Sequence, residues 1–204
     1  MKNNRKEEIL LVTLELAAQK GLANVSMQMI ADQIGIKKPS LYKHFASKDD
    51  IVREMYQFFR EKAKEAARIR DVDYDLLFSQ KTAFEVLQTM VQGYMQMSHQ
   101  EQMLSFYKVI YSERSIQPMA AKIVAEEADQ MIAATKHLFC AMEVHKILHF
   151  ENVEMSSISF AMTVHGLMDY EMDREYGEYS KEDSREKLLE KYLEWFCGEN
   201  AVKG

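Results

Sequence analysis

Helix-breaking residues are scarce in this chain. Its 204 residues contain two prolines, Pro39 and Pro118, and seven glycines. Proline and glycine interrupt helices and supply the tight turns between strands. Their scarcity predicts long uninterrupted helices and argues against many-stranded folds. Because the apolar content of 47% is enough for a full core, we expect an all-α protein.

Neither the apolar segments nor the N-terminus predict membrane insertion or export. No stretch of about 18 apolar residues exists, so no membrane span and no membrane partner are expected. The first eight residues begin basic and lead into an amphipathic pattern, without the apolar core of a signal peptide. Cys140 and Cys197 lie far apart in the sequence, as suits reduced thiols. The expected location is cytoplasmic.

Residues 26–45 predict two short helices joined by a tight turn. Ser26 is a suitable N-cap, and apolar residues recur after it at helical spacing. Gly35 follows where a helix commonly ends in a left-handed residue. Pro39 suits the first turn of the second helix, where its missing N–H is not needed. Such a pair is a helix-turn-helix whose second helix could enter a DNA major groove.

The charge of the chain is distributed unevenly. The net charge of −6 would by itself argue weakly against a nucleic-acid partner. Residues 1–60, however, carry ten Lys and Arg against seven Asp and Glu, a net charge of +3. Residues 61–204 carry sixteen against twenty-five, a net charge of −9. A basic N-terminal module on an acidic body is consistent with one end of the protein facing DNA phosphates.

The N-terminal segment resembles the DNA-binding domain of TetR-family (tetracycline-repressor-like) transcriptional regulators. The resemblance covers about residues 5–60, and its most specific part is Leu41-Tyr-x-His-Phe-x-x-Lys48. Ile30-Ala31, Ile34-Gly35-Ile36, Ser40 and Ser47-Lys-Asp-Asp-Ile51 also belong to it. Ser26 and Lys38-Pro39 depart from the common pattern, so the operator sequence cannot be inferred from the family. The resemblance implies about nine helices, a helix-turn-helix domain over 1–47, a linking helix over 48–68, and effector-binding and dimerisation functions within 48–204.

Periodicity and capping residues place the helices outside the helix-turn-helix. The expected helices span 5–20, 48–68, 82–98, 101–113, 119–142, 153–176 and 182–197. A capping box, Ser47 to Asp50, opens the helix at 48–68. Asn152 caps the helix at 153–176, Gly198 stops the last helix, and residues 70–75 are expected to form a connection. No segment predicts a strand.

The DNA contacts are expected at the start of the second helix of the helix-turn-helix and just beyond it. Side chains there reach base edges in proteins of this type. We expect Lys38, Pro39 and Tyr42 to read bases. The resemblance assigns Tyr42 to phosphate or base, and His44 and Lys48 to phosphate. The full predicted set is Lys37, Lys38, Pro39, Ser40, Tyr42, Lys43, His44 and Lys48.

A dimer on a palindromic site is expected, because one recognition helix buries too little surface for tight binding and dimers bind two half-sites. The helix at 153–176 is apolar on nearly all sides, which requires burial on all sides. The last helix carries several large apolar groups. The predicted interface consists of Phe160, Val164, Leu167, Leu189, Tyr192 and Phe196, with the core of a monomer as the alternative for the helix at 153–176.

A small-molecule effector pocket is expected in the C-terminal body. Eleven of the fifteen methionines follow residue 60, and methionine suits irregular apolar pockets between helices, although it is also common in plain cores. The predicted lining is Met90, Tyr94, Met97, Phe106, Tyr107, Met131, Thr135 and His165. By resemblance, effector binding would tilt the linking helix and move the recognition helices off their groove spacing.

The sequence therefore predicts a homodimeric repressor that binds double-stranded DNA, is released by a small, largely apolar effector, and has no cofactor, metal or catalytic residue. One alternative is a metal-sensing regulator using His137, Cys140, His145 and His149, although their spacing matches no established zinc pattern. Another is a helical ligand-binding protein or enzyme with an incidental helix-turn-helix. No Gly-rich phosphate loop, nucleophile elbow or metalloprotease motif favours an enzyme.

Overall fold

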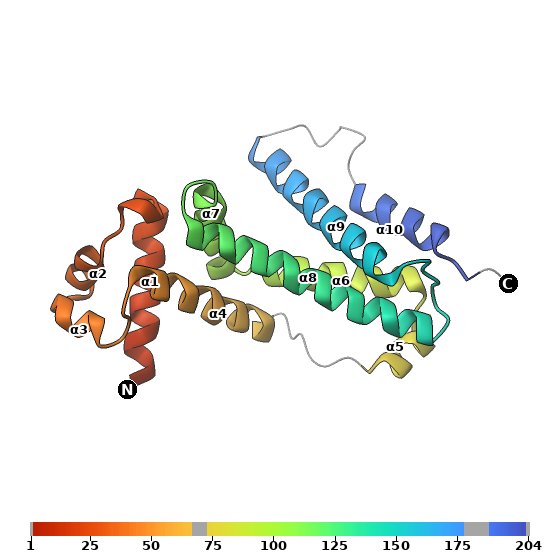
Figure 1. The fold of residues 1–204 in the computed structure, drawn as a ribbon, viewed down its shortest axis with the longest axis horizontal. Helices are drawn as coiled ribbons and strands as arrows, with labels where there is room; N and C mark the ends of the chain where they lie inside the picture. Colours follow the sequence, from red (N-terminus) through yellow and green to blue (C-terminus); the bar gives the residue numbers. More distant parts are fainter. Residues whose placement is uncertain (1, 67–72, 178–187, 203–204) are drawn as a thin grey trace. The chain divides into compact units, whose positions relative to one another are not determined.

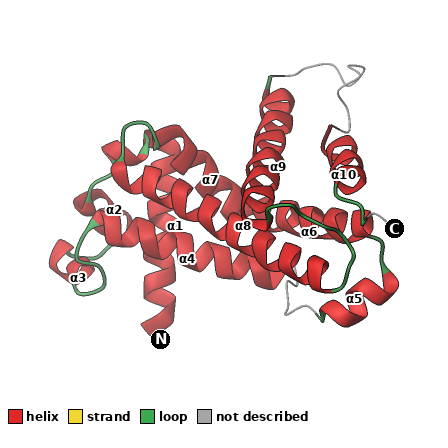
Figure 2. Ribbon diagram, turned by 45° about the vertical axis from the view of Figure 1, so that its right-hand side comes forward, coloured by secondary structure: helices red, strands yellow, loops and turns green. Residues whose placement is uncertain are grey.

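The computed structural model describes residues 2–66, 73–177 and 188–202, and it confirms the predicted all-α class (Figures 1 and 2). These residues form ten α-helices and one short 3-10 helix, close to the nine helices expected. They contain no strand, and the isolated bridge between Leu148 and Ala201 is their one β contact. None of the described helices is long and apolar enough to cross a membrane.

The helices fall into two compact units. The first comprises Met1–Ile69 and Gln96–Glu126, and the second comprises Arg70–Met95 and Glu127–Gly204. The boundary expected after residue 47 separates DNA binding from effector binding and dimerisation, and it stays a prediction. By packing, the linking helix belongs with the first three helices, because it lies in the same unit and contacts the first helix.

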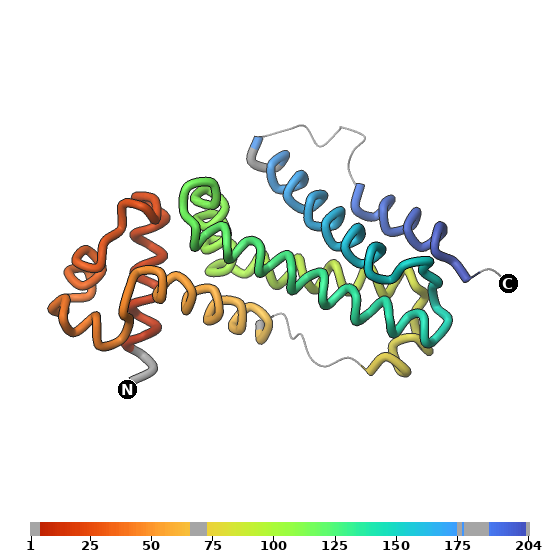
Figure 3. Tube along the Cα trace, viewed as in Figure 1, coloured from red at the N-terminus to blue at the C-terminus, as the bar shows by residue number. Residues whose placement is uncertain are grey.

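The first unit is built around α1, which packs against α2, α4 and α7. Its elements are α1 (Lys2–Lys20), η1 (Leu22–Asn24), α2 (Met27–Ile34), α3 (Lys38–Tyr42), α4 (Lys48–Ala66) and α7 (Glu101–Glu113), with α2 and α3 consecutive along the trace in Figure 3. The ring of Phe106 in α7 lies 6.1 Å from the rings of both Tyr56 and Phe59 in α4. All three side chains are buried, so an aromatic contact holds α7 to α4.

Local polar contacts fix the ends of these helices where the sequence predicts them. The Ser26 hydroxyl accepts a hydrogen bond from the Met29 N–H at 3.2 Å, which confirms Ser26 as the N-cap of α2. Gly35 has φ 75°, the left-handed conformation expected after α2. At the start of α4, Ser47 Oγ accepts from the Asp50 N–H at 3.1 Å, and the same hydroxyl donates to the Asp50 carboxylate at 2.8 Å.

The second unit contains α5, α9 and α10 together with parts of α6 and α8. The bounds are α5 (Tyr74–Gln80), α6 (Ala83–Ser98), α8 (Pro118–Val144), α9 (Val153–Tyr176) and α10 (Leu188–Glu199). Its core is a cluster of phenylalanines from α8, α9, α10 and the segment before α9. The Phe139 ring lies 4.4 Å from Phe150, 5.3 Å from Phe160 and 5.5 Å from Phe196.

Two expectations about helix boundaries in the second unit were wrong. Residues 74 and 75, expected in a connection, begin α5, whose N-cap Asp73 accepts from the Leu76 N–H at 3.1 Å. This seven-residue helix has no fully buried side chain, although Tyr74, Leu77 and Phe78 pack against the core of the second unit. Gly198 does not stop α10, which continues to Glu199. The expected start of that helix at 182 and the end of the linking helix at 68 lie outside the described residues.

Candidate nucleic-acid interface

The helix α3 is anchored on one side and exposed on the other. Leu41 is fully buried and Phe45, just after the helix, is 4% exposed, so both hold this segment to the core of the first unit. The opposite side carries the predicted DNA-binding side chains: Lys37, Lys38, Pro39 and Lys43 are exposed, Tyr42 is 47% exposed, and Ser40 and His44 are half-buried. Polar and aromatic side chains are thus presented to solvent from a fixed support.

Lys38 and Tyr42 share the exposed face of α3. They are four residues apart, the spacing that brings side chains together on a helix. The Lys38 ammonium lies 5.9 Å from the centre of the Tyr42 ring, a cation–π contact. Pro39 occupies the first turn of the helix, as expected. Two of the three residues expected to read bases therefore form one continuous surface.

The helix α3 is shorter than predicted. Its hydrogen bonding tightens at its end, since the Lys43 N–H donates to the Ser40 carbonyl and the His44 N–H donates to the Leu41 carbonyl at 2.9 Å. Such three-residue spacing is typical of a closing 3-10 turn. Lys43, His44 and Phe45 therefore follow the helix, whereas the sequence suggested a helix reaching Phe45.

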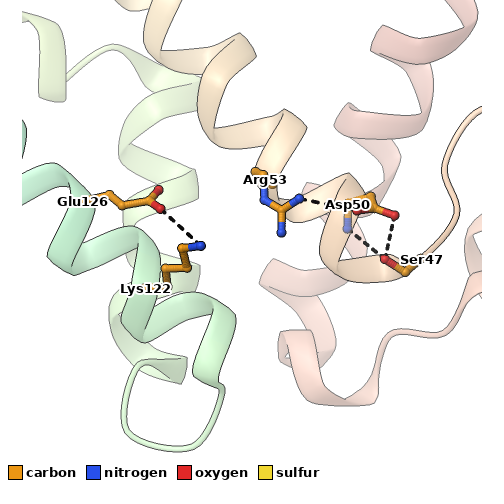
Figure 4. A network of polar contacts seen from close by, with 5 residues as sticks. All are labelled: Ser47, Asp50, Arg53, Lys122 and Glu126. Carbon is orange, nitrogen blue, oxygen red and sulfur yellow. Dashed lines mark hydrogen bonds and ion pairs between the residues drawn. The ribbon is translucent and has the colours of Figure 1, made fainter.

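An open notch of about 330 Å³ lies beside His44. Its walls come from the start of α1, the segment after α3 and the start of α4. The lining residues are Lys6, His44, Phe45, Ala46, Asp50, Arg53, Glu54 and Gln57. Lys6 pairs with Glu54 at 3.5 Å, and Arg53 pairs with Asp50 at 3.6 Å (Figure 4). These pairs are well exposed and screened by solvent, so both cations can exchange partners at low cost.

Arg53 was missed by the sequence reasoning. It stands within the first turns of α4, and Figure 4 shows it on the helix that the Ser47–Asp50 cap opens. Figure 4 also draws the ion pair of Lys122 and Glu126 on α8. The sequence could have indicated Arg53 through its position on the predicted helix at 48–68, three residues after Asp50, which places both side chains on one face near the start of that helix. Arg53 lines the same notch as His44 and Lys6, and it therefore adds a cation to the edge of the candidate interface.

The ammonium of Lys48 has protein partners. It donates to the Leu22 carbonyl oxygen at 2.8 Å and lies 3.5 Å from the Ala23 carbonyl oxygen. Lys48 is the first residue of α4, and its two partners lie in η1, between α1 and α2. The phosphate contact expected from the family resemblance stays a prediction, and this geometry gives the side chain a second possible task.

Residues 9–55 match the family described as "Bacterial regulatory proteins, tetR family". The chain carries a TetR-family domain. The match includes α2 and α3 entirely, most of α1 and the start of α4. The TetR-family domain therefore contains the whole exposed surface of α3 and the Lys48 contact.

Curated relatives match the same N-terminal region. The HTH-type transcriptional repressor KstR2 of Mycobacterium tuberculosis is 39% identical over 70 residues, 34% of this chain and 34% of KstR2. The nucleoid occlusion factor SlmA of Aliivibrio fischeri is 34% identical over 61 residues, 29% of this chain and 31% of SlmA. The chain spans about a third of the length of these relatives. Neither name is that of an enzyme.

Solved structures share the fold beyond the TetR-family domain. The flavonoid-responsive regulator FrrA has a TM-score of 0.71 at 18% identity, over 99% of this chain and 100% of that one. A Mesorhizobium loti protein described as a TetR-family transcriptional regulator has a TM-score of 0.69 at 19% identity, with the same coverage. A Saccharomonospora viridis regulator in complex with choline has a TM-score of 0.63 at 16% identity, over 99% and 100%. At these identities the likeness concerns the fold.

The residues predicted to line an effector pocket are divided between the units. Met97, Phe106 and Tyr107 belong to the first unit, together with the TetR-family domain. Met90, Tyr94, Met131, Thr135 and His165 belong to the second. In that unit, Tyr94 donates to the buried Glu127 carboxylate at 3.1 Å, and the Thr135 hydroxyl donates to the Met131 carbonyl at 2.9 Å. Phe106 is a core residue, and the pocket stays a prediction.

Most residues predicted for the dimer interface lie in the core of the second unit. Phe160, Val164, Leu189 and Phe196 are buried, and Leu167 and Tyr192 pack against the same cluster. Their burial within one chain was the stated alternative for the helix at 153–176, and the interface itself stays a prediction. The large apolar side chains exposed on α9 and α10 are instead Met155 at 58%, Met162 at 47% and Trp195 at 58%.

The histidines of the metal-sensing alternative have other neighbours. His137 Nδ1 lies 3.0 Å from the Tyr74 hydroxyl, a group whose pKa is raised by burial. His145 faces Asp75 at 3.6 Å, His149 faces Glu143 at 3.4 Å, and Cys140 is exposed. Among the described residues, no group of three His, Cys, Asp or Glu side chains could hold a metal ion.

Proposed function

We propose that this chain is a transcriptional regulator of the TetR family that acts in the cytoplasm as a homodimeric repressor. In this proposal, α3 of each protomer binds one half of a palindromic operator, and a small, largely apolar effector releases the protein from DNA. The observation that carries the proposal is the exposed face of α3, where Lys38 and Tyr42 lie together on a helix anchored by Leu41.

The chemistry of this face suits the edges of base pairs. A lysine can donate to guanine O6 and N7, and an aromatic ring or proline ring can contact a thymine methyl group. Lys38, Pro39 and Tyr42 would supply these contacts. The remaining cations, Lys37 and Lys43, and His44 would contact phosphates, which fix the register without reading sequence.

A second protomer would be held through the exposed apolar side chains of α9 and α10. Met155 and Met162 lie seven residues apart on one side of α9, with the exposed Ser159 and Gly166 on the same side. Small residues there would allow a partner helix to approach closely. Trp195 on α10 adds the large aromatic group that commonly anchors an interface. Dimerisation would place two α3 helices about 34 Å apart, one turn of DNA.

The effector is proposed to be a small organic molecule. Proteins of this fold include a regulator named as flavonoid-responsive and one solved with choline. The methionine-rich composition of this chain after residue 60 favours a largely apolar ligand. Release from DNA requires that the effector prefer the conformation that does not fit the operator. An effector that binds tightly without changing operator affinity would contradict this part of the proposal.

The decisive experiment is selection of bound duplexes from a random pool, followed by binding measurements with Lys38→Ala and Lys122→Ala. Both variants remove one exposed lysine, but Lys122 lies on α8, outside the TetR-family domain and outside the helices proposed for the dimer interface. Selection should return a two-fold-symmetric site, and Lys38→Ala alone should weaken binding to it. A pool without symmetry, or equal losses in the two variants, would overturn the proposal.

Dimerisation is tested separately by sedimentation of Trp195→Ala and Val144→Ala. Each variant truncates an exposed apolar side chain of the second unit, and Val144 is 78% exposed on α8. We expect Trp195→Ala to shift the wild-type dimer toward monomer and Val144→Ala to leave it unchanged. A wild-type protein that sediments as a monomer at all concentrations would contradict the dimer.

A further inference from the structure

The buried face of α7 ends in a carboxylate. This helix packs against α1, α4 and η1, and its buried residues recur at helical spacing: Met103, Phe106, Val109, Ile110 and Glu113. The side chain of Glu113 is only 6% exposed, although glutamate is almost never buried unless it is paired. Glu113 is therefore the polar member of a contact face that is otherwise apolar.

One oxygen of this carboxylate lacks a hydrogen-bond donor. The Oε2 atom of Glu113 is buried, and no group in the described parts of the chain donates to it. The next residue, Arg114, is exposed, and its guanidinium lies 4.9 Å from the centre of the Tyr111 ring. Lys20, in the last turn of α1, is exposed to solvent as well. A buried polar atom without a partner costs free energy, which exposure to water would return.

Two helix ends meet at this carboxylate. Glu113 is the last residue of α7, and its Oε1 atom lies 3.0 Å from the position that a Cβ on Gly21 would occupy. Gly21 directly follows the last residue of α1. Because the C-terminus of a helix carries partial negative charge, both helix ends disfavour a carboxylate at this point.

Hydrogen bonds fix the backbone on both sides of the contact. The Glu113 carbonyl accepts from the Ile116 N–H at 3.0 Å and from the Gln117 N–H at 2.8 Å. The Gly21 N–H donates to the Ala17 carbonyl at 2.9 Å. The end of α7 and the turn after α1 are therefore each held locally, and the carboxylate gains solvent when the two move apart.

The contact of α7 with α4 has the opposite character. Phe106 lies 6.1 Å from the rings of both Tyr56 and Phe59, and all three side chains are buried. Separating them would expose apolar surface to water, which is unfavourable. The helix α7 is thus held firmly to α4 at Phe106 and weakly to the turn after α1 at Glu113.

We propose that Glu113 makes the contact of α7 with Gly21 and η1 a weak point that opens transiently in the free protein, and that operator binding closes it. This inference rests on the proposed function, in which α3 binds DNA. The segment η1 leads directly to Ser26, the N-cap of α2, so opening frees the start of the helix-turn-helix. An operator that binds the closed form better shifts the equilibrium toward it. The helix α7 therefore has a movable end beside the helix-turn-helix.

The test measures amide hydrogen exchange by mass spectrometry in the wild-type protein, Glu113→Gln, Glu113→Met and Glu15→Gln. Glutamine keeps the shape of the side chain and adds N–H donors, whereas methionine removes the polar oxygens. Glu15 is exposed in the middle of α1, so Glu15→Gln controls for the loss of one negative charge. Exchange is followed in peptides covering residues 20–30, 54–63 and 109–117. Each protein is measured free, with the duplex selected by the wild-type protein, and with a mixed-sequence duplex of equal length.

We expect Glu113→Gln to slow exchange about tenfold at the amides that hold the turn, such as the Val25 N–H, which donates to the Leu22 carbonyl at 3.2 Å. The unpartnered oxygen no longer favours opening, and a change of this size matches its expected cost. Glu113→Met should slow the same amides, and Glu15→Gln should leave them unchanged. Residues 54–63 of α4 should exchange alike in all four proteins. In the wild-type protein, the selected duplex should slow the amides of the turn more than the mixed duplex does.

Exchange in both Glu113 variants that is as fast as in the wild-type protein would show that the carboxylate is already compensated, and it would overturn the inference. Slowing that extends equally to residues 54–63 would indicate general stabilisation and would also overturn it. If the selected duplex binds specifically but leaves exchange at the turn unchanged, the link to operator binding is refuted. Failure of the proposed function looks different, because the wild-type protein would then bind both duplexes equally. Slower exchange in the free Glu113 variants would still support the weak point in that event.

Discussion

In the first unit, polar contacts between residues three apart fix the ends of α2 and α4, whereas in the second unit four phenylalanines from distant parts of the sequence form the centre of the core. The first kind of contact is short-range: Ser26 with Met29, and Ser47 with Asp50. The second kind joins α8, α9 and α10 through rings such as Phe160 and Phe196, whose centres are 4.8 Å apart. The comparison teaches that local caps define the starts of α2 and α4 next to α3, while contacts between distant segments form the aromatic core of the other unit.

The largest effect is expected from Phe139→Ala in the aromatic core. Phe139 is fully buried and contacts three other phenylalanines, so its removal leaves a cavity with no small group to fill it. We expect a loss of about 3–5 kcal/mol in the free energy of unfolding, measured by urea denaturation. Val144→Ala, a truncation at an exposed position of the same helix, should cost less than about 0.5 kcal/mol. A Phe139→Ala cost below about 1 kcal/mol would mean that the core does not depend on this stack.

A smaller effect is expected from alanine at the two glycines with positive φ in the first unit. Gly35, with φ 75° and ψ 31°, has no atom within 4 Å of the position of a new Cβ, so Gly35→Ala should cost about 1–2 kcal/mol for backbone strain alone. Gly21, with φ 78° and ψ 142°, lies near a region that only glycine adopts readily. Its new Cβ would also lie 3.0 Å from the Glu113 carboxylate.

Gly21→Ala should therefore destabilise the protein more than Gly35→Ala, by about 1 kcal/mol or more in chemical denaturation. Part of the excess is steric and should disappear when Gly21→Ala is made in a Glu113→Ala background, as a double-mutant cycle would measure. Equal costs for the two glycine variants would show that the Gly21 backbone is no more strained than that of Gly35 and that the buried Glu113 side chain yields freely. That result would weaken the claim that local backbone conformation determines where the helices of the first unit end.

Next in size is the loss of the Ser47 cap at the start of α4. The Ser47 hydroxyl both accepts from and donates to Asp50, whereas Ser26 makes the single contact with Met29. We expect Ser47→Ala to cost about 1–2 kcal/mol and Ser26→Ala about 0.5–1 kcal/mol in thermal or chemical unfolding. Ser159→Ala, at an exposed position inside α9, should be neutral or slightly stabilising because alanine favours helix. Similar losses at all three serines would remove the distinction between caps and ordinary surface positions.

Local caps explain why the ends of α2 and the starts of α4 and α9 could be predicted closely, whereas the end of α3 could not. Ser26 and Gly35 mark the ends of α2, and the structure places them there. Asn152 marked the start of α9 in the same way, since its side chain accepts from the Met155 N–H at 3.0 Å. Asp73 caps the short helix α5 in the same way, but it was overlooked because seven residues give too few turns for an apolar period to be recognised. Gly198 shows the opposite error, because α10 includes this glycine and ends one residue later, at Glu199.

The candidate site was predictable where it depends on neighbours along the chain. The shared face of Lys38 and Tyr42 follows from helical spacing. The partner of Lys48, in contrast, lies 26 residues away, and no local pattern indicates it. Burial of Phe160 and Phe196 was foreseen, but an apolar pattern cannot distinguish the core of one chain from the interface between two. Trp195, exposed on the same helix as Phe196, became visible as a surface residue only in three dimensions.

The smallest effect is expected at the start of α6, where the second unit uses a local cap of its own. The Thr82 N–H donates to the Glu85 carboxylate at 2.8 Å, and the Thr82 hydroxyl donates to it at 2.9 Å. These hydrogen bonds, with that from the backbone first, hold the pKa of Glu85 below its usual value. Ionised Glu85 therefore contributes stability above the ordinary glutamate pKa, and this contribution is lost as the pH falls through the lowered pKa of the folded state.

At about pH 7 we expect Glu85→Gln to lower the melting temperature, and only slightly because the carboxylate is exposed. At about pH 3, which approaches the range where glutamate is protonated, the variant should melt like the wild-type protein. Glu194→Gln, at an exposed position inside α10, is the matched control and should not change the melting temperature at either pH. A difference that persists in acid would show that the amide disturbs the cap for another reason. A higher melting temperature of the wild-type protein at neutral pH alone would mean that local caps also stabilise the second unit. The two units would then differ in how much local caps and long-range packing each contribute.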